Sequence, residues 1–134
     1  MNISNEAKTV VEDCARQSQA ETIDFGTVIA RLAAAGIESY YADYRHGTTT
    51  YYSQEGGTHV TRLTPPEVVI ADRFEAEGLH DAVRASQRGE IKYREFMGLS
   101  MESGCVSYFV WIAGRHVKYL GRRGEVHIEH FPRQ

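Results

Sequence analysis

The sequence has few cysteines and prolines and no long apolar segment. Only two cysteines, Cys14 and Cys105, occur in 134 residues, and they lack CxxC spacing. A disulfide framework and a paired-cysteine metal site are therefore not expected. No apolar run approaches the roughly 20 residues that span a bilayer, and the polar N-terminus does not resemble a secretory signal. We expect a cytoplasmic protein with reduced, packed cysteines and no membrane partner.

An excess of one charge is also missing. The net charge is −3 and the basic residues are scattered, so we do not expect a nucleic-acid partner. Glycine-rich phosphate loops and nucleophile elbows are absent, and no cofactor is expected. Hydrophobic residues make up 42% and charged residues 25% of the chain, which is typical of globular domains. This length is enough for one domain with its own core.

What the sequence does contain is an internal repeat. The stretches GGTHVTRL (residues 56–63) and GEVHIEHF (residues 124–131) have the same pattern, 68 positions apart. At this offset, without gaps, eleven of the 58 pairs from Glu6/Phe74 to Leu63/Phe131 are identical. Self-similarity at a fixed spacing indicates duplicated structural units. We predict a single domain over residues 1–134, built from two repeats, 4–63 and 72–131, and joined by a linker over residues 64–71.

Each repeat has the pattern helix, helix, strand, strand, strand. Asp24 is a good N-cap, and Gly36 and Gly104 suit the position after a helix. The dipeptides Ala113-Gly114 and Arg123-Gly124 suggest two-residue hairpin turns. We therefore predict an α+β domain, pseudo-two-fold, with about six antiparallel strands and helices packed on the sheet. Helices are predicted over residues 5–18, 24–36, 75–87 and 92–103, and strands over residues 37–45, 105–113, 115–121 and 125–131.

Alternation along the predicted strands separates two sheet faces. With two-residue turns, Tyr119 opposes Ile128, Lys118 opposes Glu129, and Leu120 opposes His127. The expected core face of the second repeat consists of Val106, Tyr108, Val110, Ile112, Val117, Tyr119, Val126 and Ile128. The opposite face carries Cys105, Ser107, Phe109, Trp111, His116, Lys118, Leu120, His127, Glu129 and Phe131.

This second face mixes large aromatic and ionisable side chains, which is typical of a ligand site or a protein interface. The leading hypothesis is a non-enzymatic binding module, as a homodimer, that meets a small ligand or a protein partner. In an alternative arrangement the aromatic side chains lie beneath the helices and the two faces are exchanged. The candidate binding residues are Phe109, Trp111, His116, Lys118, His127 and Glu129, with Tyr41 and His59 from the first repeat.

A second hypothesis is a small hydrolase or isomerase. Its catalytic candidates are His127 and Glu129, with Glu129 or Asp43 orienting the imidazole as a general base. A metal-assisted form of this hypothesis is the alternative. His116, His127 and Glu129 could gather around a metal, but their spacing is unlike HExxH, and packed histidines on a half-buried sheet explain the pattern. We therefore expect no metal.

The second repeat is similar to a small bacterial domain of unknown function that is often labelled phage envelope protein. The resemblance covers essentially the whole chain, is strongest after Ala82, and implies a cytoplasmic bacterial or prophage protein with no assigned catalytic residues. It adds a phage or host factor as a possible partner. It depends on Ser86, Gln87, Gly89, Ile91, Tyr93, Phe96, Gly104, Cys105, Tyr119, Gly121, Arg122, Gly124, Glu125, His127, Glu129, Phe131 and Pro132.

Overall fold

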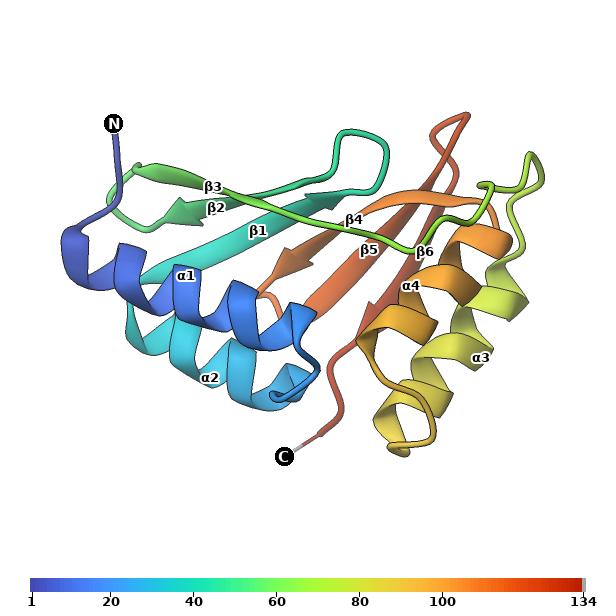
Figure 1. Cartoon of the computed structure of the whole chain (residues 1–134), viewed down its shortest axis with the longest axis horizontal. Coiled ribbons are helices and arrows are strands. Elements are labelled where there is room, and N and C mark those ends of the chain that lie inside the picture. The colour runs from blue at the N-terminus through green and yellow to red at the C-terminus, as the bar shows by residue number, and fades with distance from the viewer. Residues whose placement is uncertain (134) are drawn as a thin grey trace.

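The computed structural model describes residues 1–133 as four helices and one six-stranded antiparallel sheet, which confirms the predicted α+β class (Figure 1). Gln134, the last residue of the predicted domain, lies outside the described residues. None of the helices is long and apolar enough to cross a bilayer within residues 1–133. The elements are α1 (Asn5–Gln19), α2 (Phe25–Ala34), β1 (Ile37–Asp43), β2 (Thr48–Ser53), β3 (Thr58–Arg62), α3 (Ala76–Gln87), α4 (Tyr93–Glu102), β4 (Cys105–Trp111), β5 (His116–Gly121) and β6 (Val126–His130).

The sheet joins the two repeats through their first strands. Its strand order is β3-β2-β1-β4-β5-β6, so each repeat supplies three neighbouring strands and the antiparallel β1–β4 pair joins them. All four helices lie on one face, with α1 and α2 over the first repeat and α3 and α4 over the second (Figure 1). The other face carries no helix. We call these the helix face and the open face.

Helix ends follow the predicted signals. Asp24 begins α2, and its carboxylate accepts a hydrogen bond from the Thr27 backbone N–H at 2.8 Å. Gly36 and Gly104 follow the C-caps of α2 and α4 with φ of 85° and 87°. Glycine adopts this left-handed conformation without a steric penalty, which lets the chain turn directly into β1 and β4.

The predicted turn between β5 and β6 was wrong by one residue. Gly121 and Glu125 are joined by a backbone hydrogen bond of 2.9 Å, so the loop has three residues, Arg122, Arg123 and Gly124. Gly124 has φ of 81°, as three-residue hairpins with a left-handed final residue require. One extra loop residue shifts the register by one, and a shift by one reverses the faces of the whole strand.

The consequence is that β6 lies opposite to the prediction. Tyr119 pairs with His127 and not with Ile128, and Lys118 pairs with Ile128 and not with Glu129. Leu120 pairs with Val126 and not with His127. His127 and Glu129 therefore belong to the helix face. Val126 and Ile128, predicted for the core, are on the open face with exposed fractions of 51% and 45%.

In the first repeat, the predicted face of His59, shared with Tyr41, was wrong. Ser53 and Gly57 close another three-residue loop, and Gly56 has φ of 88°. His59 consequently pairs with Tyr51 on the helix face. A register irregularity in β4 also moves Cys105 from the predicted open face into the core, where it is fully buried. The predicted core positions of β4 and β5, Val106, Tyr108, Val110, Ile112, Val117 and Tyr119, are confirmed as buried.

Candidate functional site

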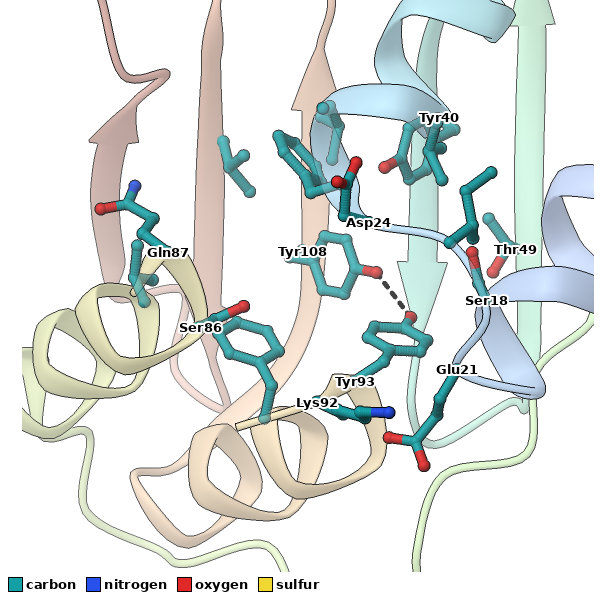
Figure 2. A pocket seen from close by; sticks show the side chains of 18 of the residues that line it. Ser18, Glu21, Asp24, Tyr40, Thr49, Ser86, Gln87, Lys92, Tyr93 and Tyr108 are labelled. Atoms are coloured by element: carbon teal, nitrogen blue, oxygen red, sulfur yellow. Dashed lines mark hydrogen bonds between the residues drawn. The ribbon is translucent and has the colours of Figure 1, made fainter. Parts of the chain in front are cut away.

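A large cleft lies between the two helix pairs, with the helix face of the sheet as its floor (Figure 2). Its volume is about 740 Å³, which is within the usual range for small-molecule sites. Helix α1 and the start of α2 form one wall, and α3 and the start of α4 form the other. The floor includes Tyr40, Tyr51, Tyr108, Val110, Val117 and Tyr119.

Identical residues of the two repeats gather at this cleft. Five of the eleven identical pairs have both members in its lining. They are Ser18/Ser86, Gln19/Gln87, Ile23/Ile91, Tyr40/Tyr108 and Tyr51/Tyr119. The two walls thus present similar side chains. The similarity ends at the rim, where Asp24 of one repeat corresponds to Lys92 of the other.

The tyrosines that line the cleft, on its floor and at the start of α4, are neutral hydrogen-bonding groups in apolar surroundings. The Tyr93 and Tyr108 hydroxyls are 2.7 Å apart and share a hydrogen bond (Figure 2). Burial raises the pKa of Tyr93 to about 12, and burial also raises the pKa of Tyr40 and Tyr108 well above the ordinary value. Phenols of this kind keep their protons and offer a polar contact at the end of an apolar ring.

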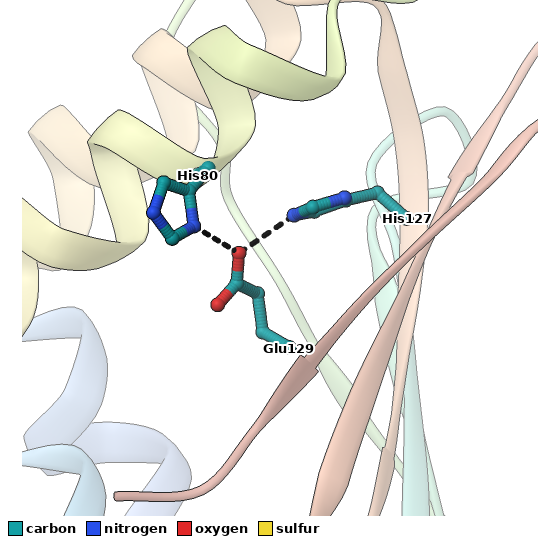
Figure 3. Close-up of side chains that lie close together, drawn as sticks. All are labelled: His80, His127 and Glu129. Carbon is teal, nitrogen blue, oxygen red and sulfur yellow. Dashed lines mark hydrogen bonds and ion pairs between the residues drawn. The ribbon is translucent and has the colours of Figure 1, made fainter.

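The second feature is a cluster of His80, His127 and Glu129 at the α3–β6 contact (Figure 3). Glu129 Oε2 lies 2.6 Å from His127 Nε2 and 2.8 Å from His80 Nδ1. The exposed fractions of the side chains are 12% for Glu129, 21% for His127 and 45% for His80. Glu129 also lines the cleft, so this group of three reaches the cleft through its carboxylate.

Two opposing effects set the charge of Glu129. Partial burial alone would raise its pKa, but hydrogen bonds from His80 and His127 outweigh burial and lower the pKa below its ordinary value. The carboxylate is therefore held in its charged form, able to accept hydrogen bonds or to bind a cation.

The first repeat holds a simpler version of this cluster. At the offset of 68, His80, His127 and Glu129 correspond to Glu12, His59 and Thr61. His59 Nε2 lies 2.6 Å from Glu12 Oε1, so the strand histidine contacts the helix carboxylate directly in the first repeat. In the second repeat the strand carboxylate of Glu129 lies between the strand histidine His127 and the helix histidine His80. Only the second repeat adds a third ionisable group.

The remaining predicted site residues lie on the open face and not with the histidine cluster. Phe109 is at the centre of this surface, 4.2 Å from the Trp111 ring and 5.4 Å from the Tyr41 ring. Lys118 and His116 are their neighbours on β5. The predicted grouping of His116 with His127 and Glu129 was therefore wrong, because the sheet separates them.

His80 was missed by sequence reasoning. It lies in the middle of a helix, and no local motif connects it to β6. The repeat did contain a signal for His80, because His80 corresponds to Glu12 and both positions carry an ionisable side chain. This signal points to a site only when His59 and His127 are known to face the helices. Both cysteines, in contrast, are buried as predicted, and burial raises the pKa of Cys105 to about 12.

Comparison with known proteins assigns no activity to these sites. No family model matches the chain. Uncharacterized proteins of Mycobacterium tuberculosis and Mycobacterium bovis are each 31% identical to it over 58 residues. The match covers 43% of this chain and 35% of each mycobacterial protein, so the chain spans about a third of the length of these relatives.

Proposed function

We propose that this protein is a binding module whose small ligand occupies the cleft between the helix pairs. The observation that carries the proposal is the cleft itself, with about 740 Å³ of space over an apolar, tyrosine-rich floor. Concave sites that combine apolar walls with a few polar groups are the usual sites for small ligands. The identical pairs on opposite walls support it, because packing alone does not require polar pairs such as Ser18 and Ser86 beside an open cleft.

The lining indicates the kind of ligand. The floor favours a mainly apolar or aromatic molecule, because tyrosine rings provide contact area and their hydroxyls provide polar contacts. Charged groups occur at the rim, where Lys92, Asp24 and Glu21 line the opening. A ligand with an apolar body and a polar end would match both regions.

Filling the cleft tests this proposal. Ser18→Trp and Ser86→Trp each place a large ring in the cleft from opposite walls, whereas Thr9→Trp, on an exposed position of α1, is the matched control. Anilinonaphthalene sulfonate serves as the apolar probe, followed by fluorescence, with NMR shifts of the backbone to locate it. We expect saturable binding that both cleft variants abolish and the control keeps. Probe binding that is the same in all three proteins would contradict the proposal.

An enzymatic alternative is supported by one specific contact. The 2.6 Å separation of His127 Nε2 and Glu129 Oε2 suits a histidine base oriented by a carboxylate. This contact supports the hydrolase or isomerase hypothesis. A library of ester and small carbonyl substrates tests it. Turnover that His127→Ala abolishes and His59→Ala preserves would support this function, and absence of turnover across the library would count against it.

We also propose that the open face pairs with a second copy of the chain. The face exposes Val60, Val126 and Ile128, which are 45–52% accessible, around the aromatic cluster of Phe109. A two-fold dimer places one such surface against itself.

Sedimentation analysis tests the dimer. Ile128→Glu adds a charge to the open face at an exposed position, and Glu77→Gln on the helix side is the control. We expect a dimer that Ile128→Glu converts to a monomer. A wild-type protein that stays monomeric at every concentration would contradict self-association. A cytoplasmic location, with both cysteines reduced, is part of the same proposal.

A further inference from the structure

We infer that His80, His127 and Glu129 bind one divalent transition-metal ion, for which zinc is the best fit. The inference is separate from ligand binding in the cleft. It concerns a site that combines a helix residue with two strand residues, and it uses the only cluster of this kind within residues 1–133.

The ligand atoms are close enough to share an ion. His80 Nδ1, His127 Nε2 and one oxygen of Glu129 all lie within 4.8 Å of one another. Zinc binds nitrogen and oxygen ligands at about 2.0–2.2 Å in tetrahedral geometry, so its ligands are separated by about 3.3–3.5 Å. The separations from Glu129 Oε2, 2.6 and 2.8 Å, are somewhat shorter. Small side-chain rotations would bring the three atoms to the spacing that an ion requires.

The chemical identity of the ligands selects the class of metal. Two imidazoles and one carboxylate suit zinc, iron and similar transition metals, whereas magnesium and calcium prefer oxygen ligands. Three protein ligands leave positions open for water or a small molecule. The half-exposed ring of His80 provides a route for the ion from solvent.

The first repeat shows that two side chains, one histidine and one carboxylate, are enough to form a helix–strand contact. There, one carboxylate and one histidine, Glu12 and His59, form the helix–strand contact alone at 2.6 Å. The second repeat places two histidines on a single carboxylate oxygen. As hydrogen bonds, both contacts require a proton on the facing ring nitrogen. An ion would replace these protons and bond all three groups at once.

Metal titration of the untagged protein, stripped with a chelator, tests this inference. Calorimetry with zinc measures stoichiometry, and visible absorption with cobalt reports on coordination. We expect one ion per chain, with affinity that weakens as the pH falls because binding displaces protons. His80→Asn and Glu129→Gln should weaken binding by at least the roughly 10- to 100-fold that loss of an outer-shell partner costs. His59→Ala, which removes the histidine of the simpler cluster in the first repeat, should leave zinc binding unchanged.

His80→Asn is the decisive variant, because His80 is half exposed and its substitution should leave the fold intact. Circular dichroism verifies the fold of the variant. Absence of saturable zinc and cobalt binding to the wild-type protein would overturn the inference. Binding that survives both His80→Asn and Glu129→Gln would overturn it equally, since the ion would then lie elsewhere. If zinc binding is lost in both variants, anaerobic competition between iron(II) and zinc shows which of the two metals the site prefers. Failure of probe binding in the cleft would leave these results unaffected.

Discussion

Glu129 illustrates, at the scale of single residues, how neighbours determine the charge of a partly buried group. Its carboxylate has lost water on the helix face but receives hydrogen bonds from two histidines, and the balance lowers its pKa. Hydrogen bonds to a charged group contribute more than neutral ones, about 1.5–3 kcal/mol each. The contact of α3 with β6 therefore depends on this side chain even without an ion.

Stability should accordingly depend on pH through Glu129. Since its pKa is lower in the folded than in the unfolded protein, the contribution is present above the ordinary value of 4.5 and is lost as the pH falls below it. With chelator present, we expect Glu129→Gln to be less stable than the wild type near neutral pH, by about 1–3 kcal/mol. Denaturant unfolding should show this gap narrowing below pH 4.5. Glu77→Gln, at an exposed position of α3, is the control, and a stability difference that does not change with pH would refute the argument.

Two matched glycines give a second prediction at this scale. Gly36 and Gly104 both have positive φ, but a Cβ at Gly36 would meet nothing within 4 Å, whereas a Cβ at Gly104 would clash with the Arg73 backbone oxygen. Gly36→Ala should cost about 1–2 kcal/mol from the left-handed backbone alone. Gly104→Ala should lower the free energy of unfolding clearly more, because the backbone at Arg73 must move to accommodate the new Cβ. Urea unfolding measures both costs, and equal costs would show that the backbone at Arg73, before α3, moves easily.

At the scale of elements, the hairpin loops decide which residues meet. Each loop has three residues, where a two-residue turn was predicted between β5 and β6, and this length turns His59 and His127 toward the helices. A glycine in the left-handed conformation is compatible with both loop lengths. The dipeptide Arg123-Gly124 therefore indicated a turn but left the register undetermined.

Helix starts provide an element-scale prediction with an internal control. Asp24 caps α2 through the Thr27 backbone, whereas Lys92, its counterpart before α4, makes no side-chain cap bond. Asp24→Ala should cost about 1 kcal/mol, and Lys92→Ala should cost little. Lys92→Asp should stabilise the protein, because a carboxylate also complements the helix dipole. Thermal unfolding of the three variants measures these effects, and a destabilising Lys92→Asp would point to an interaction of Lys92 at the cleft rim.

At the scale of the whole molecule, neither repeat is complete alone. The β1–β4 pair joins them in the middle of the sheet, and the cleft has one wall from each. Separating the repeats would expose a strand edge and the tyrosine floor together. Exposed edges and apolar surface of this kind favour aggregation over a stable monomer.

We therefore expect residues 1–68 alone not to fold as a monomer. NMR spectra of the fragment should lack dispersed signals, whereas the full chain should give a single cooperative unfolding transition. Addition of a fragment with residues 69–134 should restore dispersed NMR signals, if the core shared by the two repeats is what stabilises the fold. A monomeric 1–68 fragment that unfolds cooperatively would show that each repeat has a sufficient core of its own.

The sequence by itself determined the helices, the strand pattern and the sheet's antiparallel character. Caps such as Asp24 and Gly104, and alternation such as that from Val106 to Ile112, depend on residues close together in the chain. Local patterns of this kind also predicted that Phe109 and Trp111 lie away from the core. The repeat predicted the twofold pattern of elements because both copies kept the same spacing.

Only the tertiary structure decided which ionisable side chains meet. His80 and Glu129 are 49 positions apart, and their contact depends on the register of β6, on the position of α3, and on a loop length that differs from the prediction by one residue. A one-residue shift reverses a strand's faces, so a small local uncertainty moved His127 and Glu129 from the open face to the helices. The cleft likewise exists only because two helix pairs from distant segments lie apart on one sheet.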